Sequence, residues 1–130
     1  MRAKGTFEIK AEPQPPYHQE AGISLGRMVF RKDFSGDLIG ESTVEVLTAR
    51  TPVEGSAAYV GIERIVGKLS DLSGSFVVAH LGLMNAGAQR QEIPIVPDSG
   101  TDELKGISGR FEIQIEGGKH FYVVEYELPS

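Results

Sequence analysis

The chain has 130 residues, a length typical of one domain, and it contains no cysteine. Disulfides, thiolate metal sites and thiol catalysis are therefore excluded. Its 18 acidic and 13 basic residues give a formal net charge of −5. The basic residues are scattered rather than clustered, so the sequence does not predict a nucleic-acid partner.

The N-terminal segment, MRAKGTFEIKAEP, is charged and lacks the apolar stretch of a secretory signal. No apolar run approaches the ~18 residues that a membrane-spanning helix requires. We therefore expect a cytoplasmic protein without a membrane partner.

Short runs rich in β-branched and aromatic residues follow one another along the whole chain, with Gly, Pro, Asp and Ser between them. This pattern predicts strands at residues 4–12, 22–34, 38–51, 55–69, 72–84, 88–97, 110–116 and 119–129. No helical period persists, although the segment TDELKG allows one helical turn. Short strands joined by hairpin-length turns predict an all-β fold, a small eight-stranded antiparallel up-and-down β-barrel that forms a single domain over residues 1–130.

The turn near Ser70 allows the two strands that flank it to be aligned. Pairing Ser70 with Ser73 places Glu63 opposite His80, whereas a three-residue loop would place Arg64 there instead. Because a shift by one residue moves every side chain to the other face, the register decides which residues share a face. We adopt the first register, in which Glu63 and His80 lie together.

The preceding loop is aligned by pairing Thr51 with Gly55, which matches Val44 to Ile62. The three strands then have an aliphatic face and a mixed face. The aliphatic face consists of Val44, Val46, Val60, Ile62, Val66, Val77, Leu81 and Leu83. The mixed face carries Glu41, Glu45, Tyr59, Glu63, Phe76, Val78 and His80.

Two arrangements of these faces are open. In the first, the aliphatic face is the core, and Glu63 and His80 lie in solvent. In the second, the mixed face lines the lumen, which in an eight-stranded barrel has room for packed side chains or one small ligand. The aliphatic exterior would then need cover, and we expect a homo-oligomer.

Buried side by side, Glu63 and His80 would form an acid–base pair, because burial raises a carboxylate pKa and a neighbouring imidazolium lowers it. These two are the candidate catalytic residues. The candidate ligand-binding residues are Glu41, Glu45, Tyr59, Phe76 and Val78, together with Tyr122 and Tyr126 of the last strand, for which core packing is the other interpretation.

No phosphate-binding loop, nucleotide fingerprint or serine-nucleophile motif occurs, so no cofactor is predicted. His18, His80 and His120 are far apart and lack the short spacing of metal ligands, so no metal is predicted either. The small-molecule partner that we expect is an apolar or amphipathic ligand.

Several blocks of sequence, in order along the chain, resemble a family of small bacterial proteins, the domain of unknown function 3224. The blocks are FSGDLIGEST (34–43), AAYVGIERIVGKL (57–69), GSFVVAHLG (74–82), PDSGTDELKGISG (97–109) and YVVEYELP (122–129). That family is similar in fold to allene oxide cyclase and dirigent proteins, which implies a barrel with a central cavity, often in an oligomer. The family's motif positions fall on Glu41, Ser42, Glu63, Arg64, His80 and Gly82, while Ala79 and Asp102 depart from its pattern.

The leading hypothesis is a β-barrel that binds an apolar or amphipathic small molecule in its lumen. The first alternative is a cyclase or isomerase that uses Glu63 and His80 for proton transfer. The second is a structural oligomeric barrel whose interior is filled by its own side chains. An open lumen is required by the first two and excluded by the third.

Overall fold

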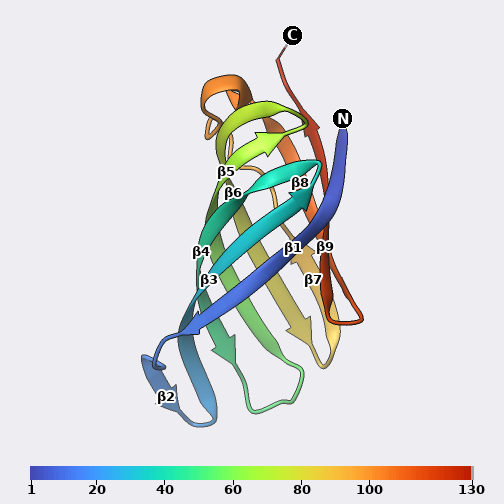
Figure 1. Cartoon of the computed structure of the whole chain (residues 1–130). Coiled ribbons are helices and arrows are strands. Elements are labelled where there is room, and N and C mark those ends of the chain that lie inside the picture. Colours follow the sequence, from blue (N-terminus) through green and yellow to red (C-terminus); the bar gives the residue numbers. More distant parts are fainter. Residues whose placement is uncertain (130) are drawn as a thin grey trace.

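The computed structural model describes residues 1–129, and its strands form one antiparallel sheet that is rolled into a barrel (Figure 1). The strands are β1 (Arg2–Pro13), β2 (His18–Glu20), β3 (Ile23–Gly36), β4 (Leu38–Arg50), β5 (Ala57–Leu69), β6 (Leu72–Asn85), β7 (Ala88–Glu92), β8 (Ser108–Glu116) and β9 (Lys119–Glu127). A single 3₁₀ turn, η1 (Asp102–Leu104), precedes β8. The predicted eight-stranded barrel is confirmed, and TDELKG forms the expected helical turn.

The strands follow the order β7-β6-β5-β4-β3-β1-β9-β8, and β2 pairs with β3 beside this path. Residues 93–96 close the barrel, because they lie between β6 and β8 and bond to both. The amide of Ala79 donates to Pro94 (3.0 Å), and the amide of Phe111 donates to Ile93 (2.9 Å). Closure leaves few unpaired backbone groups at the sheet edges.

Most predicted strands agree with the structure to within two residues at each end. The exceptions are the segment 88–97, whose regular strand ends at Glu92, and β2, which the Pro-rich sequence EPQPPYHQEAG concealed. Prolines and isolated polar residues resemble a loop in sequence, and only pairing with Ile23–Leu25 makes His18–Glu20 a strand.

The turn between β5 and β6 is tighter than predicted. Ser70 and Asp71 have φ of 47° and 71°, so they form a two-residue hairpin turn in which Leu69 faces Leu72. The register is therefore displaced by two residues from the predicted one. Because side chains alternate with a period of two, the predicted faces of β5 and β6 survive this error.

The register of β4 against β5 was predicted wrongly by one residue. Val44 lies opposite Glu63, not Ile62, because the loop between these strands spans residues 51–56 and Arg50 pairs with Ala57. The two faces of β4 are consequently exchanged. Val44 is buried inside the barrel, and Glu41, predicted for the mixed face, lies outside.

The mixed face of β5 and β6 lines the barrel, which is the second of the two arrangements that the sequence left open. Glu63, Val78 and His80 are buried, whereas Ile62 is 59 % exposed. The barrel thus has an outer apolar patch, formed by Ile39, Leu47, Val60, Ile62, Val66 and Leu83.

The half of the barrel near the two termini is filled with side chains. Its aromatic rings stack against one another, as Phe76 does on Phe111 at 6.0 Å between ring centroids. The other members of this core are Ala3, Phe7, Phe34, Leu38, Ile65, Leu69, Val78, Ile93, Ile95, Leu104, Ile107, Tyr122, Val124 and Tyr126. In Figure 1 the N and C marks and η1 lie at this end, and β2 lies at the other.

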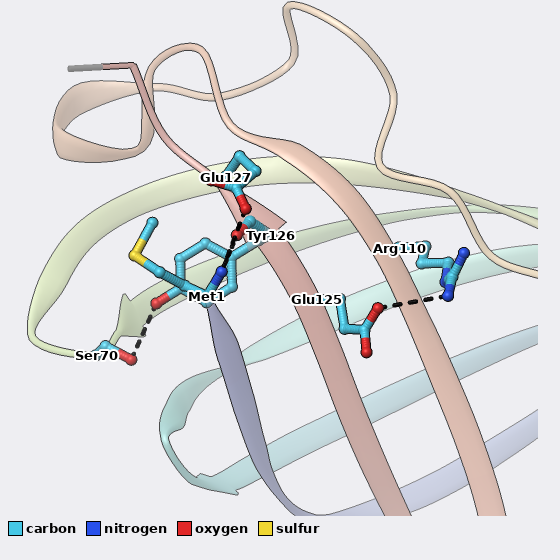
Figure 2. Close-up of polar contacts among 6 residues, drawn as sticks. All are labelled: Met1, Ser70, Arg110, Glu125, Tyr126 and Glu127. Carbon is cyan, nitrogen blue, oxygen red and sulfur yellow. Dashed lines mark hydrogen bonds and ion pairs between the residues drawn. The ribbon is translucent and has the colours of Figure 1, made fainter.

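The first and last strands are joined at the packed end (Figure 2). The ammonium of Met1 donates to the carbonyl of Tyr126 (2.8 Å) and lies 3.4 Å from Glu127, and the Tyr126 hydroxyl donates to Ser70 Oγ (3.2 Å). These bonds connect β1, β9 and the β5–β6 turn. They hold the closed end of the barrel together.

Candidate functional site

The half of the barrel away from the termini is hollow. A cavity of about 240 Å³ opens there, within walls that are mostly apolar. Its lining consists of Phe7, Ile9, Phe30, Lys32, Val44, Val46, Thr48, Tyr59, His80, Gln91, Ile113, Ile115 and His120. The volume is somewhat below the usual range of ligand-binding cavities and corresponds to roughly eight water volumes, enough for one compact molecule.

Four adjacent strands each send one polar side chain into the wall between the cavity and the packed core. Lys32 comes from β3, Ser42 from β4, Glu63 from β5 and His80 from β6, and all four are buried. Lys32 and Ser42 are directly opposed across their two strands. We call these four residues the polar cluster.

Glu63 is the centre of the polar cluster. Its Oε1 lies 2.6 Å from His80 Nε2 and accepts a hydrogen bond from Lys32 Nζ at 3.1 Å. Its Oε2 accepts a hydrogen bond from Ser42 Oγ at 2.5 Å. Both carboxylate oxygens are therefore satisfied by donors from the three other strands, as a buried charge requires.

The carboxyl group of Glu63 is ionised in this environment. Burial alone would raise its pKa, because desolvation penalises the charged form. The hydrogen bond with His80, the charge of Lys32 and the hydrogen bond from Ser42 outweigh burial, so the pKa of Glu63 falls below its ordinary value of 4.5. An ionised Glu63 requires the proton of the short contact to reside on Nε2 of His80.

Aromatic rings hold Lys32 in place. Its Nζ lies 4.8 Å from the centroid of Phe7, within the range of a cation–π interaction. Phe7 in turn packs against His120, with 5.1 Å between ring centroids. The Lys32 ammonium thus contacts both the Phe7 ring and the Glu63 carboxylate.

Tyr59 forms one side of the cavity because Gly82 leaves space for its ring. A Cβ atom at Gly82 would lie 2.0 Å from the Tyr59 ring, so the ring covers the glycine across the two strands. The Tyr59 hydroxyl accepts a hydrogen bond from Gln91 Nε2 at 3.1 Å. This bond connects β5 to β7 over Gly82 of the intervening strand β6.

The structure brings the predicted pair Glu63 and His80 into contact, although the two are diagonal neighbours rather than opposed residues. His80 faces Gly61 across the strands, and Glu63 faces Val78. Tyr59 and His80 line the cavity, whereas Glu63 lies behind His80 and Lys32. The catalytic role of the pair stays a prediction.

The other predicted ligand contacts lie elsewhere. Glu45 points outward and pairs with Arg27, and Glu41 is exposed as well, because the one-residue register error exchanged the faces of β4. Placing these two carboxylates on the lumen face was therefore wrong. Arg64 is also outside, where its guanidinium donates to Ser75 Oγ at 3.4 Å.

Phe76, Val78, Tyr122 and Tyr126 belong to the packed core, and they do not line the cavity. The hydroxyl of Tyr122 accepts a hydrogen bond from the Leu38 amide (2.8 Å) and donates to the carbonyl of Ser35 (2.9 Å). Its hydroxyl therefore stabilises the β3–β4 turn. The core-packing interpretation of the two tyrosines is the one that the structure supports.

Lys32 and His120 were missed from the sequence. A signal for Lys32 exists, because Phe30, Lys32 and Phe34 alternate within β3 and a strand places them on one face. A lysine between two inward phenylalanines is unusual for a solvated face. His120 carries no such signal, because it follows a glycine turn and resembles a surface residue.

Two absences concern the described part of the chain. Residues 1–129 contain no group of three or more His, Cys, Asp or Glu side chains that could hold a metal ion. In the same residues, no helix is long and apolar enough to cross a membrane.

These features define a class, a small antiparallel β-barrel whose half-open lumen ends on a buried cluster of Lys, Glu, His and Ser. The model of the family described as "Protein of unknown function (DUF3224)" matches residues 3–126. The chain therefore belongs to this family, as the sequence blocks indicated.

A crystal structure of a DUF3224 protein with unknown function from Shewanella oneidensis MR-1 is similar to this chain. The two share 41 % sequence identity and a TM-score of 0.95, over 100 % of this chain and 98 % of the other. No curated protein matches. The likeness to allene oxide cyclase and dirigent proteins stays a prediction.

Proposed function

We propose that the protein binds a small apolar or amphipathic molecule in the hollow half of its barrel. The observation that carries this proposal is the division of the interior into a packed half and a cavity of about 240 Å³ that ends on the polar cluster. Apolar walls with a few convergent polar groups are the usual composition of a ligand site. A purely structural barrel gains nothing from leaving this volume unfilled, because unfilled interior space is destabilising.

The experiment is native mass spectrometry of protein purified gently from its own host, without added ligand. We expect a fraction of the protein to exceed the chain mass by one discrete small-molecule increment. A matched pair of variants locates the molecule. Ile113→Trp fills part of the cavity, whereas Ile39→Trp adds the same ring to the outer apolar patch.

The increment should disappear in Ile113→Trp and persist in Ile39→Trp. An aromatic reporter dye that gains fluorescence in apolar sites provides a second readout, with the same expected difference between the variants. A protein that carries no increment and takes up no dye would contradict the proposal, as would a molecule that both variants retain.

One observation favours an isomerase or cyclase as the second candidate. Glu63 orients His80 through a 2.6 Å contact, and His80 borders the cavity, which is the arrangement of a base held by a buried carboxylate. In such a reaction His80 Nδ1 would take a proton from one carbon of the bound molecule and return it to another, while Glu63 stabilises the imidazolium.

Deuterium exchange tests this second candidate. The copurified molecule is incubated with the protein in deuterated buffer and then analysed by mass spectrometry. An isomerase should introduce deuterium into the molecule, and both Glu63→Gln and His80→Ala should slow the exchange without abolishing binding. Exchange no faster than in buffer alone would exclude proton transfer and leave a binding protein.

A further inference from the structure

The ionisable groups that line the cavity differ from those of the protein as a whole. The chain has a net charge of −5, yet no carboxylate is among the cavity-lining residues in the described part of the chain. The nitrogen bases Lys32, His80 and His120 all line it. Glu63 contributes its charge from behind, where three donors occupy its oxygens.

Lys32 has hydrogen-bonding capacity that the protein does not use. Its side chain is only 5 % exposed, and within residues 1–129 its Nζ makes one hydrogen bond, to Glu63. A lysine ammonium has three N–H donors, and the face of Phe7 takes up only one further side of it. A buried donor without an acceptor is costly, so the remaining N–H groups call for an acceptor inside the cavity.

His80 also lines the cavity, and one of its ring nitrogens is not used by Glu63. Its Nε2 contacts Glu63, and no group within residues 1–129 is hydrogen-bonded to its Nδ1. No fully buried polar atom in residues 1–129 lacks a partner, so Nδ1 is not fully buried, and its residue lines the cavity. In a protonated imidazole Nδ1 is a donor as well, so it can bind the same kind of acceptor as the ammonium.

We propose that the lumen selects a molecule with a compact apolar body and a single carboxylate head group, and that the head is held by Lys32 Nζ and His80 Nδ1. This inference rests on the proposed binding function and names the class of its ligand. Charge-assisted hydrogen bonds from an ammonium in an apolar site are stronger than neutral ones. The polar cluster therefore favours a charged head group over a neutral one of the same shape. The apolar walls around Phe30, Val46 and Ile113 accept the body.

The test compares two probes of the same shape, benzoate and benzamide, which differ in the charge of the head group. Binding is followed by amide chemical shifts in ¹⁵N-labelled protein. We expect benzoate to bind about tenfold more tightly than benzamide, since one charge-assisted contact is worth about one decade of affinity. Shifts should concentrate at Lys32, Tyr59, His80 and Ile113.

Variants assign the selectivity to the ammonium. In Lys32→Met the preference for benzoate should fall to about twofold or less, because the apolar walls are unchanged and the charge is lost. Lys68→Met is the matched control, since Lys68 is an exposed lysine of β5, and it should keep the full preference. Lys32→Arg, which keeps the charge, should retain part of it and shows whether any loss in Lys32→Met reflects misfolding.

The outcomes separate this inference from the function on which it rests. Equal affinity of the wild-type protein for the two probes, with shifts at the cavity, would overturn the carboxylate inference and support a lumen that binds without regard to charge. Shifts confined to the exterior, or no binding of either probe, would overturn both. A preference for benzoate that survives Lys32→Met would overturn the assignment to Lys32.

Discussion

Replacing Glu63 alone should cost more stability than replacing both members of the buried Lys32–Glu63 pair. In Glu63→Gln the Lys32 ammonium keeps its buried position but loses the carboxylate 3.1 Å away. An uncompensated buried charge of this kind typically costs about 3–5 kcal/mol of unfolding free energy. For a chain of this size the corresponding fall in Tm is about 3–4 °C per kcal/mol.

Lys32→Met should cost less, about 2–3 kcal/mol, because Glu63 keeps its contacts with Ser42 and His80. Methionine is unbranched and close to the lysine stem in volume, so packing against Phe7 is largely retained.

The double variant Lys32→Met/Glu63→Gln buries no unpaired charge. We therefore expect it to be more stable than Glu63→Gln alone, with a coupling energy of about 3–4 kcal/mol between the two positions, which exceeds the cost of Lys32→Met. Urea unfolding near neutral pH gives the free energy of unfolding of the wild-type protein, the two single variants and the double variant. Equal m-values would show that their unfolding transitions are comparable. The exposed pair Lys68→Met and Glu41→Gln serves as the control, and each change there should stay within about 0.5 kcal/mol.

The reasoning would be refuted by additive effects. If the two single losses sum to that of the double variant within about 0.5 kcal/mol, Lys32 and Glu63 do not act as a pair in solution. A double variant less stable than either single variant would show that the polar cluster is held by its hydrogen bonds to Ser42 and His80 rather than by charge compensation.

Three further predictions concern acid stability, the cavity wall and self-association. The folded-state pKa of Glu63 lies below its ordinary value of 4.5, so its ionised form adds stability that is complete above pH 4.5 and is lost as the pH falls through the folded-state pKa. Urea midpoints measured from neutral to acidic pH should therefore decline less steeply in Glu63→Gln than in the wild-type protein. Parallel curves would contradict this prediction. Gly82→Ala should displace the Tyr59 ring, because the new Cβ would lie 2.0 Å from it. We expect a loss of about 1–3 kcal/mol of unfolding free energy and weaker dye uptake. Unchanged stability and uptake would show that the ring moves freely. The homo-oligomer expected from the sequence stays a prediction. The wild-type protein should sediment as an oligomer, and Ile62→Lys, which changes the outer apolar patch, should sediment as a smaller species. A monomeric wild-type protein would refute this prediction.

The barrel and half of the polar cluster were predictable from the sequence because strand alternation has a period of two. The β5–β6 register was wrong by two residues, yet Glu63 and His80 remained on one face. The β4 register was wrong by one, and this was enough to place Glu41 and Glu45 inside when they lie outside. Loop length decides such a shift, and the sequence RTPVEG admits more than one pairing.

The division of the lumen into packed and hollow halves was not predictable. It depends on how far side chains from strands distant in sequence reach across the barrel, as Phe76 of β6 and Phe111 of β8 do. The sequence indicated Ser42 only through the family resemblance, and it did not indicate Lys32. The reason is that no residue pairing between β3 and β4 was predicted. Pairing Lys32 with Ser42 would have required that alignment.

The pairing of β1 with β9 places the first and last strands of the chain side by side in the barrel. Ala3 lies opposite Val124, and the first amino group is bonded to the carbonyl of Tyr126. A circular permutant that joins the two ends by a short linker and opens the chain at the Gly117–Gly118 turn should keep every strand pair of the sheet. Because Met1 and the end of β9 lie at the packed end of the barrel, away from the cavity, a fluorescent domain or an affinity handle attached beside them would leave the cavity unobstructed.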